Sequence, residues 1–418
     1  MLFYVIVGLV LVSFFMEVYL EYLNSTSRSP ELPDELKDIY DEDKYRKSVE
    51  YEKVKHRFSL VRGGFGLILI LAMLFLGGFA MLDEFARGIS GNMVVIALIF
   101  FGIIMVGSDI LNMPFDWYGT FVIEERFGFN KSTPRIFVGD KLKGWILTVI
   151  IGGGLLSIVT WFYYQTTEWF FIYALALVTG FMLFMNLFYS TLIVPLFNKQ
   201  TPLKDGRLRD EISSLSARTG FRLDDVFVID GSKRSTKANA YFAGLGKKKR
   251  IVLFDTLIEE LSVNNILAVL AHEIGHYKKK HVVSNIIISL VTTAITLYLL
   301  SVMVANPALS AALGAGQPSF HMGLIAFGIL YSPVSAIFGL ANNWISRKNE
   351  YEADRFAAEH HSARDLADAL KKLSVKNLSN LQPHPVYVFV HYSHPPLLQR
   401  LDALKKSESA QTVHYEPG

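Results

Sequence analysis

Two histidines and a glutamate in one short segment have the types and spacing needed for metal-dependent hydrolysis. The segment is His272-Glu-Ile-Gly-His276, and it ends a strongly helical apolar stretch that begins at Leu267. Residues four apart lie on one face of a helix, so His272 and His276 can bind the same zinc ion. Glu273 is then placed to take a proton from a zinc-activated water and to return it to a leaving amine. Gly275 would allow another element to approach this helix closely.

A catalytic zinc needs a third protein ligand and one open position. The chain contains no cysteine, so this ligand must be a histidine, an aspartate or a glutamate. We assign it to Glu350, because Glu350 shares a helix face with the small residues Ala353 and Ala357. That face would pack closely on the helix that carries the two histidines. Asp354 lies on the same face and is expected to hold the other ring nitrogen of a ligand histidine.

Two nearby acids are alternatives for the third ligand. Glu352 belongs to a charged stripe at helical spacing that we interpret as a solvated face, formed by Lys348, Glu352, Arg355 and Glu359. If Glu350 does not bind zinc, Glu352 or Asp354 is the next candidate.

The other histidines differ in their surroundings. His394 precedes a rigid Pro-Pro step in the segment His391-Tyr-Ser-His-Pro-Pro, and it could donate a hydrogen bond to a developing oxyanion. Six others lie among polar residues or at the ends of apolar runs and are predicted to be solvent-exposed: His56, His281, His321, His360, His361 and His414.

The elements that position these residues lie in a strongly apolar chain. Of its 418 residues, 51% are hydrophobic and only 19% are charged, which is typical of a membrane protein. Seven apolar runs are long enough to cross hydrocarbon of about 30 Å as helices. They lie near residues 2–20, 60–82, 93–112, 145–163, 169–196, 282–305 and 322–345. The first is expected to be a retained span rather than a signal peptide, because it lacks a basic start and a cleavage site.

The distribution of lysine and arginine predicts the orientation. The connections after the first and third runs are rich in basic residues, whereas the intervening connections carry almost none, so the N-terminus is expected outside and the polar segments on the cytoplasmic side. The formal net charge of +3 is too small to indicate a nucleic-acid partner. Membrane lipid is therefore the expected surrounding of the apolar runs.

The polar segments 198–281 and 346–418 are predicted to fold together as one small α+β domain, separated by spans 6 and 7 in residues 282–345. Residues 1–197 hold spans 1–5 and their loops. Strands at 238–242 and 251–254 flank a turn at 244–247, which predicts a β-hairpin, and 226–229 is a further short strand. A helix from about Val263 would carry the two histidines and run almost directly into the sixth span.

Several motifs together resemble the type 1 CAAX prenyl protease family of membrane zinc metallopeptidases. They run in order over residues 35–405: Glu124-Glu-Arg-Phe-Gly-Phe-Asn-Lys-Ser-Thr, Gly231-Ser-Lys-Arg-Ser, Asn239-Ala-Tyr-Phe, Arg250-Ile-Val-Leu-Phe-Asp-Thr-Leu, His272-Glu-Ile-Gly-His, Ser346-Arg-Lys-Asn-Glu-Tyr-Glu-Ala-Asp and His391-Tyr-Ser-His-Pro-Pro-Leu. The resemblance implies a polytopic α-helical membrane protein. Its seven tilted helices would surround a water-filled chamber, capped on the cytoplasmic side by the small α+β zinc domain.

The resemblance also implies roles for single residues. His272, His276 and Glu350 would bind one zinc ion per chain and Glu273 would be the base. Asn239 and His394 would contact the substrate or its tetrahedral intermediate. Asn239 lies in a candidate edge strand, to which an extended peptide could add through main-chain hydrogen bonds. Arg400 is expected near the substrate, paired with an acid that the sequence does not identify.

Three departures from the family pattern favour a prokaryotic member in a plasma membrane. The chain has no cysteine, no long charged insertion before the His272 helix and no dilysine signal near its end. The expected substrate is a peptide or protein, prenylated or otherwise membrane-associated. One alternative is a quality-control protease for membrane proteins with no prenyl requirement. A second is a non-catalytic chamber in which zinc is only structural, but such a zinc needs no base and usually has a closed fourth position.

Overall fold

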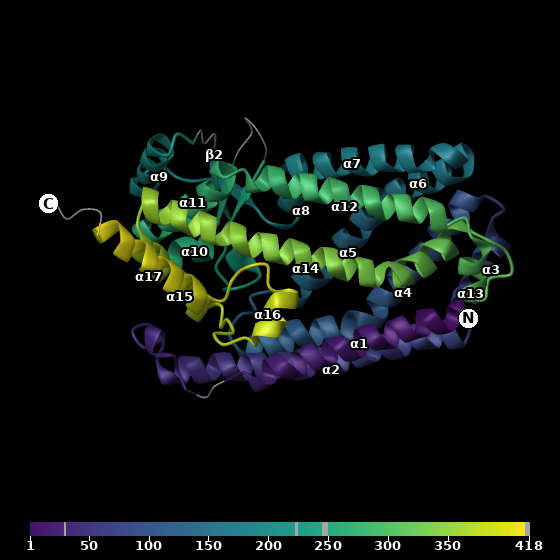
Figure 1. The fold of residues 1–418 in the computed structure, drawn as a ribbon, viewed down its shortest axis with the longest axis horizontal. Coiled ribbons are helices and arrows are strands. Elements are labelled where there is room, and N and C mark those ends of the chain that lie inside the picture. Colours follow the sequence, from purple (N-terminus) through teal and green to yellow (C-terminus); the bar gives the residue numbers. More distant parts are fainter. Residues whose placement is uncertain (29–30, 222–224, 245–249, 414–418) are drawn as a thin grey trace.

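Seven helical segments of the computed structural model are long and apolar enough to cross a membrane, as predicted. The structure describes residues 1–28, 31–221, 225–244 and 250–413. The helices run along the long axis of the molecule, with the sheet at one end and the N-terminus at the other (Figure 1). The seven segments are Leu2–Thr26, Glu42–Phe75, Met93–Glu124, Pro134–Thr166, Phe170–Phe197, His281–Met303 and Phe320–His360.

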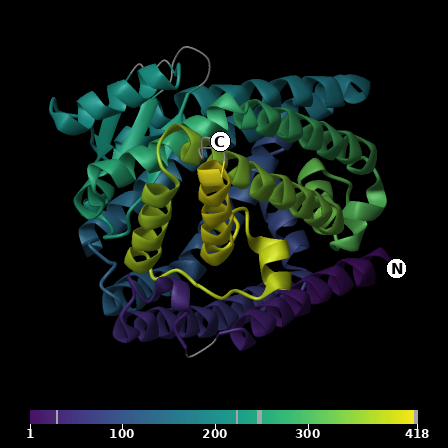
Figure 2. The ribbon, with the colours of Figure 1, turned by 60° about the vertical axis from the view of Figure 1, so that its left-hand side comes forward.

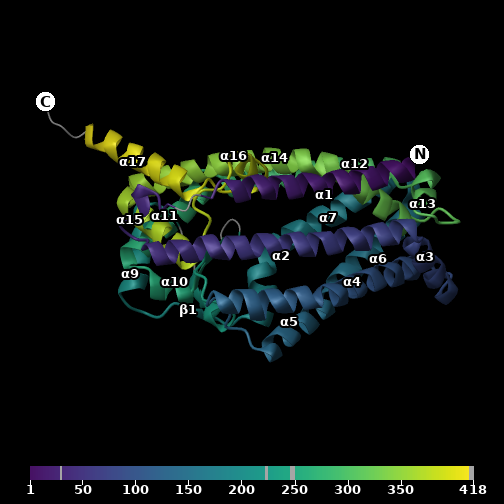
Figure 3. The same cartoon turned by 90° about the horizontal axis from the view of Figure 1, so that it is seen from below.

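Several of these segments consist of two helices in line. The third begins as α4 (Met93–Tyr118), the fourth joins α5 (Pro134–Leu147) to α6 (Gly153–Thr166), and the fifth joins α7 (Phe170–Phe188) to α8 (Val194–Phe197). Helix α1 (Leu2–Thr26) packs against α2 (Glu42–Phe75), and α4 packs against α6 (Figure 3).

The second span ends earlier than predicted. Residues 60–82 were expected to form one helix, but α2 stops at Phe75 and a separate helix, α3 (Gly78–Ile89), follows. Gly77 adopts a φ of 69°, in the left-handed region that glycine enters without steric cost, and this turns the chain.

The spans are closely packed mainly at their ends. In α7 the buried residues are Phe170 and Ala174, and in α12 (His281–Met303) they are His281, Leu297 and Leu300. At the end far from the sheet, the four apolar ones join the buried Phe100 and Phe320 in one apolar core. The described middle portions of these two helices contain no buried residue, as expected for helices that surround a space rather than a solid core.

A four-stranded sheet in the order β1-β2-β4-β3 lies at the other end. β3 (Ala240–Ala243) and β4 (Arg250–Phe254) pair antiparallel, so the predicted hairpin is confirmed, although most of its turn lies outside the described residues. β2 (Asp225–Ile229) pairs parallel with β4. The short β1 (Gln200–Pro202), antiparallel to β2, was not predicted. β3 forms one edge of the sheet.

Two separate parts of the chain form one apolar core around this sheet. Buried residues from 203–274 and from 356–404 pack together, and they include Leu215, Leu253, Leu270, Ala357 and Leu366. Figure 2 shows the C-terminal helices at this end of the molecule. The helices at this end that come from the first part are α9 (Arg207–Arg218), α10 (Asp255–Glu260) and α11 (Val263–Lys278). The C-terminal ones are α15 (Ala363–Lys376), α16 (Pro385–His391) and α17 (Leu397–Val413).

Helix α14 (Phe320–His360) connects the spans to this core without interruption. Its 41 residues extend over about 61 Å at 1.5 Å per residue, roughly twice the thickness of hydrocarbon. The short α13 (Pro307–Ala312) precedes it at the far end. One rigid element therefore carries both the seventh span and the acidic residues near Glu350.

Candidate functional site

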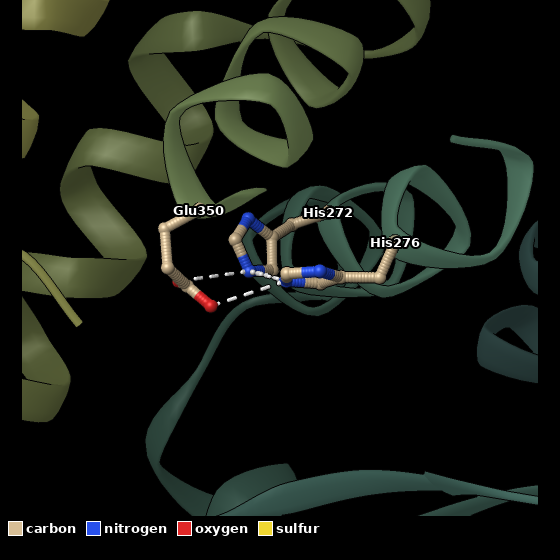
Figure 4. Close-up of side chains that lie close together, drawn as sticks. All are labelled: His272, His276 and Glu350. Carbon is tan, nitrogen blue, oxygen red and sulfur yellow. Dashed lines mark hydrogen bonds and ion pairs between the residues drawn. The ribbon is translucent and has the colours of Figure 1, made fainter. Parts of the chain in front are cut away.

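Helix α11 places His272 and His276 on one face. The helix begins at a proper cap, since the Ser262 hydroxyl accepts a hydrogen bond from the backbone N–H of Asn265. Its apolar residues pack into the core around the sheet. The two Nε2 atoms lie 3.1 Å apart (Figure 4), so both imidazoles point at one position.

Glu350 reaches the same position from α14. Its Oε1 lies 3.2 Å from His276 Nε2, and its Oε2 lies 3.5 Å from His272 Nε2. One ligand atom from each of these three residues lies within 4.8 Å of the others. In Figure 4 the carboxylate comes from one helix and the two rings from another.

Gly275 permits this close approach. A Cβ atom at residue 275 would lie 3.0 Å from Phe356 Cβ and 3.1 Å from Ala353 Cα, closer than real Cβ atoms normally come. The small residues Ala353 and Ala357 are fully buried against α11, as their place on the Glu350 face predicted. The packing of α11 on α14 thus depends on small residues on both helices.

Asp354 and Arg400 contact His272 at Nδ1, the ring nitrogen that does not face His276. Asp354 Oδ1 lies 2.8 Å from His272 Nδ1, and Arg400 Nε donates a hydrogen bond of 2.8 Å to Asp354 Oδ2. All three residues are buried. Burial alone would lower the pKa of His272, but the hydrogen bonds with Asp354 and Glu350 outweigh it and raise the pKa to about 9. Burial likewise opposes the charge of Arg400, yet Asp354 raises the pKa of its guanidinium.

The acid that pairs with Arg400 is therefore Asp354. The Arg400 side chain is only 11% exposed, and its NH1 also lies 3.5 Å from Glu350 Oε2. Both charged groups of the pair contact His272 at Nδ1, whereas Nε2 is the ring nitrogen that faces His276, so the pair orients the His272 ring.

The other side of the site opens into a cavity of about 940 Å³. Its lining includes Glu273, His276, Asn239 and His394. His394 lies in the loop between α16 and α17, with its Nδ1 2.8 Å from Glu350 Oε2. It also borders a second cavity of about 590 Å³, which Arg400 lines.

Asn239 lies directly before β3. Its side chain is exposed, and its Oδ1 accepts a hydrogen bond from the backbone N–H of Ala240. The whole of β3 lines the larger cavity together with Asn239. The edge strand of the sheet and His276 therefore border the same cavity.

Two histidines predicted to be exposed are buried instead. His281 is 5% exposed, and its Nδ1 lies 3.0 Å from His276 Nδ1. His321 is fully buried at the far end of the spans, where its Nε2 lies 2.6 Å from Asp83 Oδ1. Both histidines stand at the start of a helix near polar residues. This sequence pattern does not distinguish a histidine that is buried against a polar partner from one at a solvent-exposed helix end. His414 lies outside the described residues.

The group His272, His276 and Glu350 fits a metal ion. Glu350 is 3% exposed, and its carboxylate oxygens lie 2.8–3.5 Å from ring nitrogens of His272, His276 and His394. A carboxylate buried this deeply is costly unless positive charge compensates it, and a bound cation would supply that charge. Two imidazole nitrogens and one carboxylate form a donor set with room for a further ligand.

Two protein-family models match the chain and together cover nearly all of it. Residues 21–199 match "CAAX prenyl protease N-terminal, five membrane helices", and residues 202–408 match "Peptidase family M48". The second match contains every residue of the candidate site. Membership of family M48 implies a bound metal.

Full-length relatives agree with these matches. The CAAX prenyl protease 1 homolog of Arabidopsis thaliana is 35% identical, with 96% of each chain covered. CAAX prenyl protease 1 of Saccharomyces cerevisiae is 34% identical, with 96% of this chain and 94% of that chain covered. The human homolog is also 34% identical, with 90% and 88% covered.

A solved structure shares the fold. The crystal structure of S. mikatae Ste24p is 33% identical and superimposes with a TM-score of 0.92, over 97% of this chain and 99% of that chain. Seven membrane-competent helices, a metal-binding group and these similarities describe a multi-pass membrane metalloendopeptidase. The chain therefore belongs to the CAAX prenyl protease 1 family of M48 peptidases.

Proposed function

We propose that this metalloendopeptidase uses zinc, held by His272, His276 and Glu350, to cleave membrane-associated polypeptides near their C-termini, prenylated ones included. The observation that carries the proposal is a group of three potential metal ligands, one of which, His276, lines the same cavity as Glu273 and the edge strand β3. The relatives named CAAX prenyl protease support the substrate class.

The substrate would bind to the edge of the sheet. Among the described residues β3 has a paired neighbour on one side only, so an extended peptide could add to its other side through main-chain hydrogen bonds. Asn239, exposed at the start of β3, would hold the peptide next to the scissile bond. A peptide bound in this way passes in front of the two ligand imidazoles.

Zinc, when bound, supplies a Lewis acid that activates water and polarises the scissile carbonyl. Glu273 lines the cavity beside the ligands and would accept the proton of the attacking water, then pass it to the leaving amine. His394, on the same cavity wall, would donate a hydrogen bond to the oxyanion. Asp354 and Arg400 would keep the His272 ring oriented.

Arg400 is better placed to orient the His272 ring, through Asp354, than to contact the substrate. Its Nε and NH2 atoms both bond to Asp354. A contact with substrate would have to come through the second cavity, which Arg400 borders together with His394.

The site would face the cytoplasm. The basic loops after spans 1 and 3 and the metallopeptidase end of the chain lie at the same end of the molecule, which the positive-inside rule assigns to the cytoplasmic side. The unburied middle portions of the spans support a chamber that substrates enter from that side. A prokaryotic plasma membrane remains part of this proposal.

The decisive experiment compares purified wild type with Glu273→Gln and with Glu259→Gln, a control at an exposed residue of α10. Each is assayed with a farnesylated CAAX peptide and with the same peptide lacking the lipid. We expect Glu273→Gln to retain zinc and lose at least about 100-fold in kcat, within the range for removal of a general base, while Glu259→Gln is unaffected. Equal activity of Glu273→Gln and wild type would reject the mechanism, and equal cleavage of both peptides would favour the quality-control alternative.

A further inference from the structure

His281 lies between a proposed zinc ligand and a carboxylate of the seventh span. Its Nδ1 is 3.0 Å from His276 Nδ1, and its Nε2 is 3.2 Å from Glu352 Oε2. The side chain of His281 is 6% exposed and that of Glu352 is 39% exposed, so the row of contacts leads outward from the site. Both nitrogen atoms of this buried ring therefore have a polar partner.

A zinc ion bound at His276 Nε2 would fix where each proton lies. A neutral imidazole carries one N–H and one acceptor nitrogen. His276 Nε2 faces His272 and Glu350, so a metal bound there would take its lone pair and its proton would be on Nδ1. That N–H donates to His281 Nδ1, which must be an acceptor. The proton of His281 is then on Nε2 and donates to Glu352.

We propose that His281 and Glu352 are positioning residues that hold the His276 ring and set its tautomer for zinc binding. This inference rests on the proposed zinc site. His272 has its own support in Asp354, which lies 2.8 Å from its Nδ1. The two ligand histidines are thus oriented separately, one directly by a carboxylate and the other through an intervening imidazole.

The backbone between α11 and α12 makes this arrangement possible. The chain leaves α11 through a turn in which the N–H of Lys279 bonds to Gly275 O and the N–H of Lys280 bonds to Tyr277 O. Lys280 has a φ of 62°, a left-handed conformation that a residue other than glycine adopts only at a cost. This turn brings the first residue of α12 back onto His276, five residues earlier.

Three elements consequently meet at one ligand. His276 belongs to α11, His281 begins the sixth span, and Glu352 lies on α14 two residues after the proposed ligand Glu350. The orientation of the His276 ring is therefore tied to the relative positions of the sixth and seventh spans. His281 also lines the larger cavity, next to His276.

The test measures zinc affinity rather than activity. Purified metal-free His281→Leu, His281→Asn and Glu352→Ala would be titrated with zinc against a chelator, and with cobalt, whose visible spectrum reports the ligand geometry. Asparagine places an amide oxygen two bonds from Cβ, as Nδ1 is in histidine, so it can still accept from His276 Nδ1–H. Glu359→Ala, at an exposed residue of the same helix, is the matched control.

We expect His281→Leu to bind zinc about 10–100-fold more weakly and to alter the cobalt spectrum, the usual effect of removing the partner of a ligand histidine. His281→Asn should recover most of the affinity, Glu352→Ala should show an intermediate loss, and Glu359→Ala should match wild type. If His281→Leu does not fold, the other two variants carry the test.

Two outcomes would overturn the inference. One is wild-type affinity and spectrum in folded His281→Leu and in Glu352→Ala. The other is a loss in His281→Asn as large as in His281→Leu, because the acceptor atom would then be irrelevant. By contrast, a wild-type protein that binds no zinc would contradict the proposed function itself, so the two failures are distinguishable.

Discussion

Gly275 is the residue at which the smallest change should have a large effect. An alanine methyl group at this residue would lie 3.0–3.1 Å from Phe356 Cβ and Ala353 Cα, and backbone atoms cannot move away cheaply. We expect Gly275→Ala to force α14 away from α11, to lower the free energy of unfolding by about 1–3 kcal/mol and to weaken metal binding. Thermal unfolding and metal content of the purified protein would measure both effects.

The control is Gly139→Ala in α5, where a Cβ atom would meet nothing within 4 Å. That variant should be neutral or slightly more stable, because alanine favours a helix over glycine. If Gly275→Ala were as stable and as well metallated as Gly139→Ala, the close packing of α11 on α14 would be irrelevant to the site.

Asp354 carries a second prediction at the scale of single residues. Asp354→Asn would leave the buried Arg400 guanidinium without its carboxylate and His272 Nδ1 without its charged partner. We expect a loss of about 3–5 kcal/mol in the free energy of unfolding, the usual cost of breaking a buried ion pair. Chemical denaturation would measure it. The double variant Asp354→Asn, Arg400→Met should recover part of the loss, and no recovery would contradict the pairing.

The residues around the metal position differ in how far the sequence predicts them. His272, His276 and Glu350 follow from helical spacing, because four-residue intervals and small neighbours translate directly into one shared face. His281 does not follow, because a histidine after three lysines has the composition of a solvated helix end. Only the left-handed turn at Lys280 turns its ring back toward His276.

At the scale of elements, an ionic cluster joins two adjacent spans. Lys141 Nζ on α5 lies 2.7 Å from Asp109 Oδ1 and 2.8 Å from Asp116 Oδ2, both on α4. Lys141→Met would leave two partly buried carboxylates without this partner, at a cost of about 1–3 kcal/mol. A lower midpoint of thermal unfolding in detergent is expected. Lys131→Met, at an exposed residue, should not change the midpoint, and equal midpoints for both variants would contradict a stabilising role.

Apolar length predicts the spans well but does not predict their breaks. Gly77 and Gly78 lie inside an apolar run, so the sequence alone favours one continuous helix from residue 60 to 82. β1 escapes prediction for a different reason, since the segment Gln200–Pro202 is short, polar and ends in proline. The break at Gly77 uses a glycine conformation that an apolar run does not reveal, whereas β1 forms through its pairing with β2.

At the scale of the whole molecule, the two ends should lie on opposite sides of a membrane. Gly91 lies between α3 and α4 at the end that holds the N-terminus, whereas Ser213 lies on α9 beside the sheet (Figure 1). The chain has no cysteine, so a single cysteine introduced at either residue is the only thiol. Both residues are exposed and can therefore react with a reagent in water.

We expect a membrane-impermeant thiol reagent to label Gly91→Cys in intact cells and to label Ser213→Cys only after the membrane is opened. The reason is the number of spans: with seven, the two termini lie on opposite sides, and the basic loops assign the sheet to the cytoplasm. The unaltered chain is the control for background labelling. Labelling of both cysteines in intact cells would mean that one predicted span does not cross, and labelling of Ser213→Cys alone would reverse the orientation and place the metal site outside.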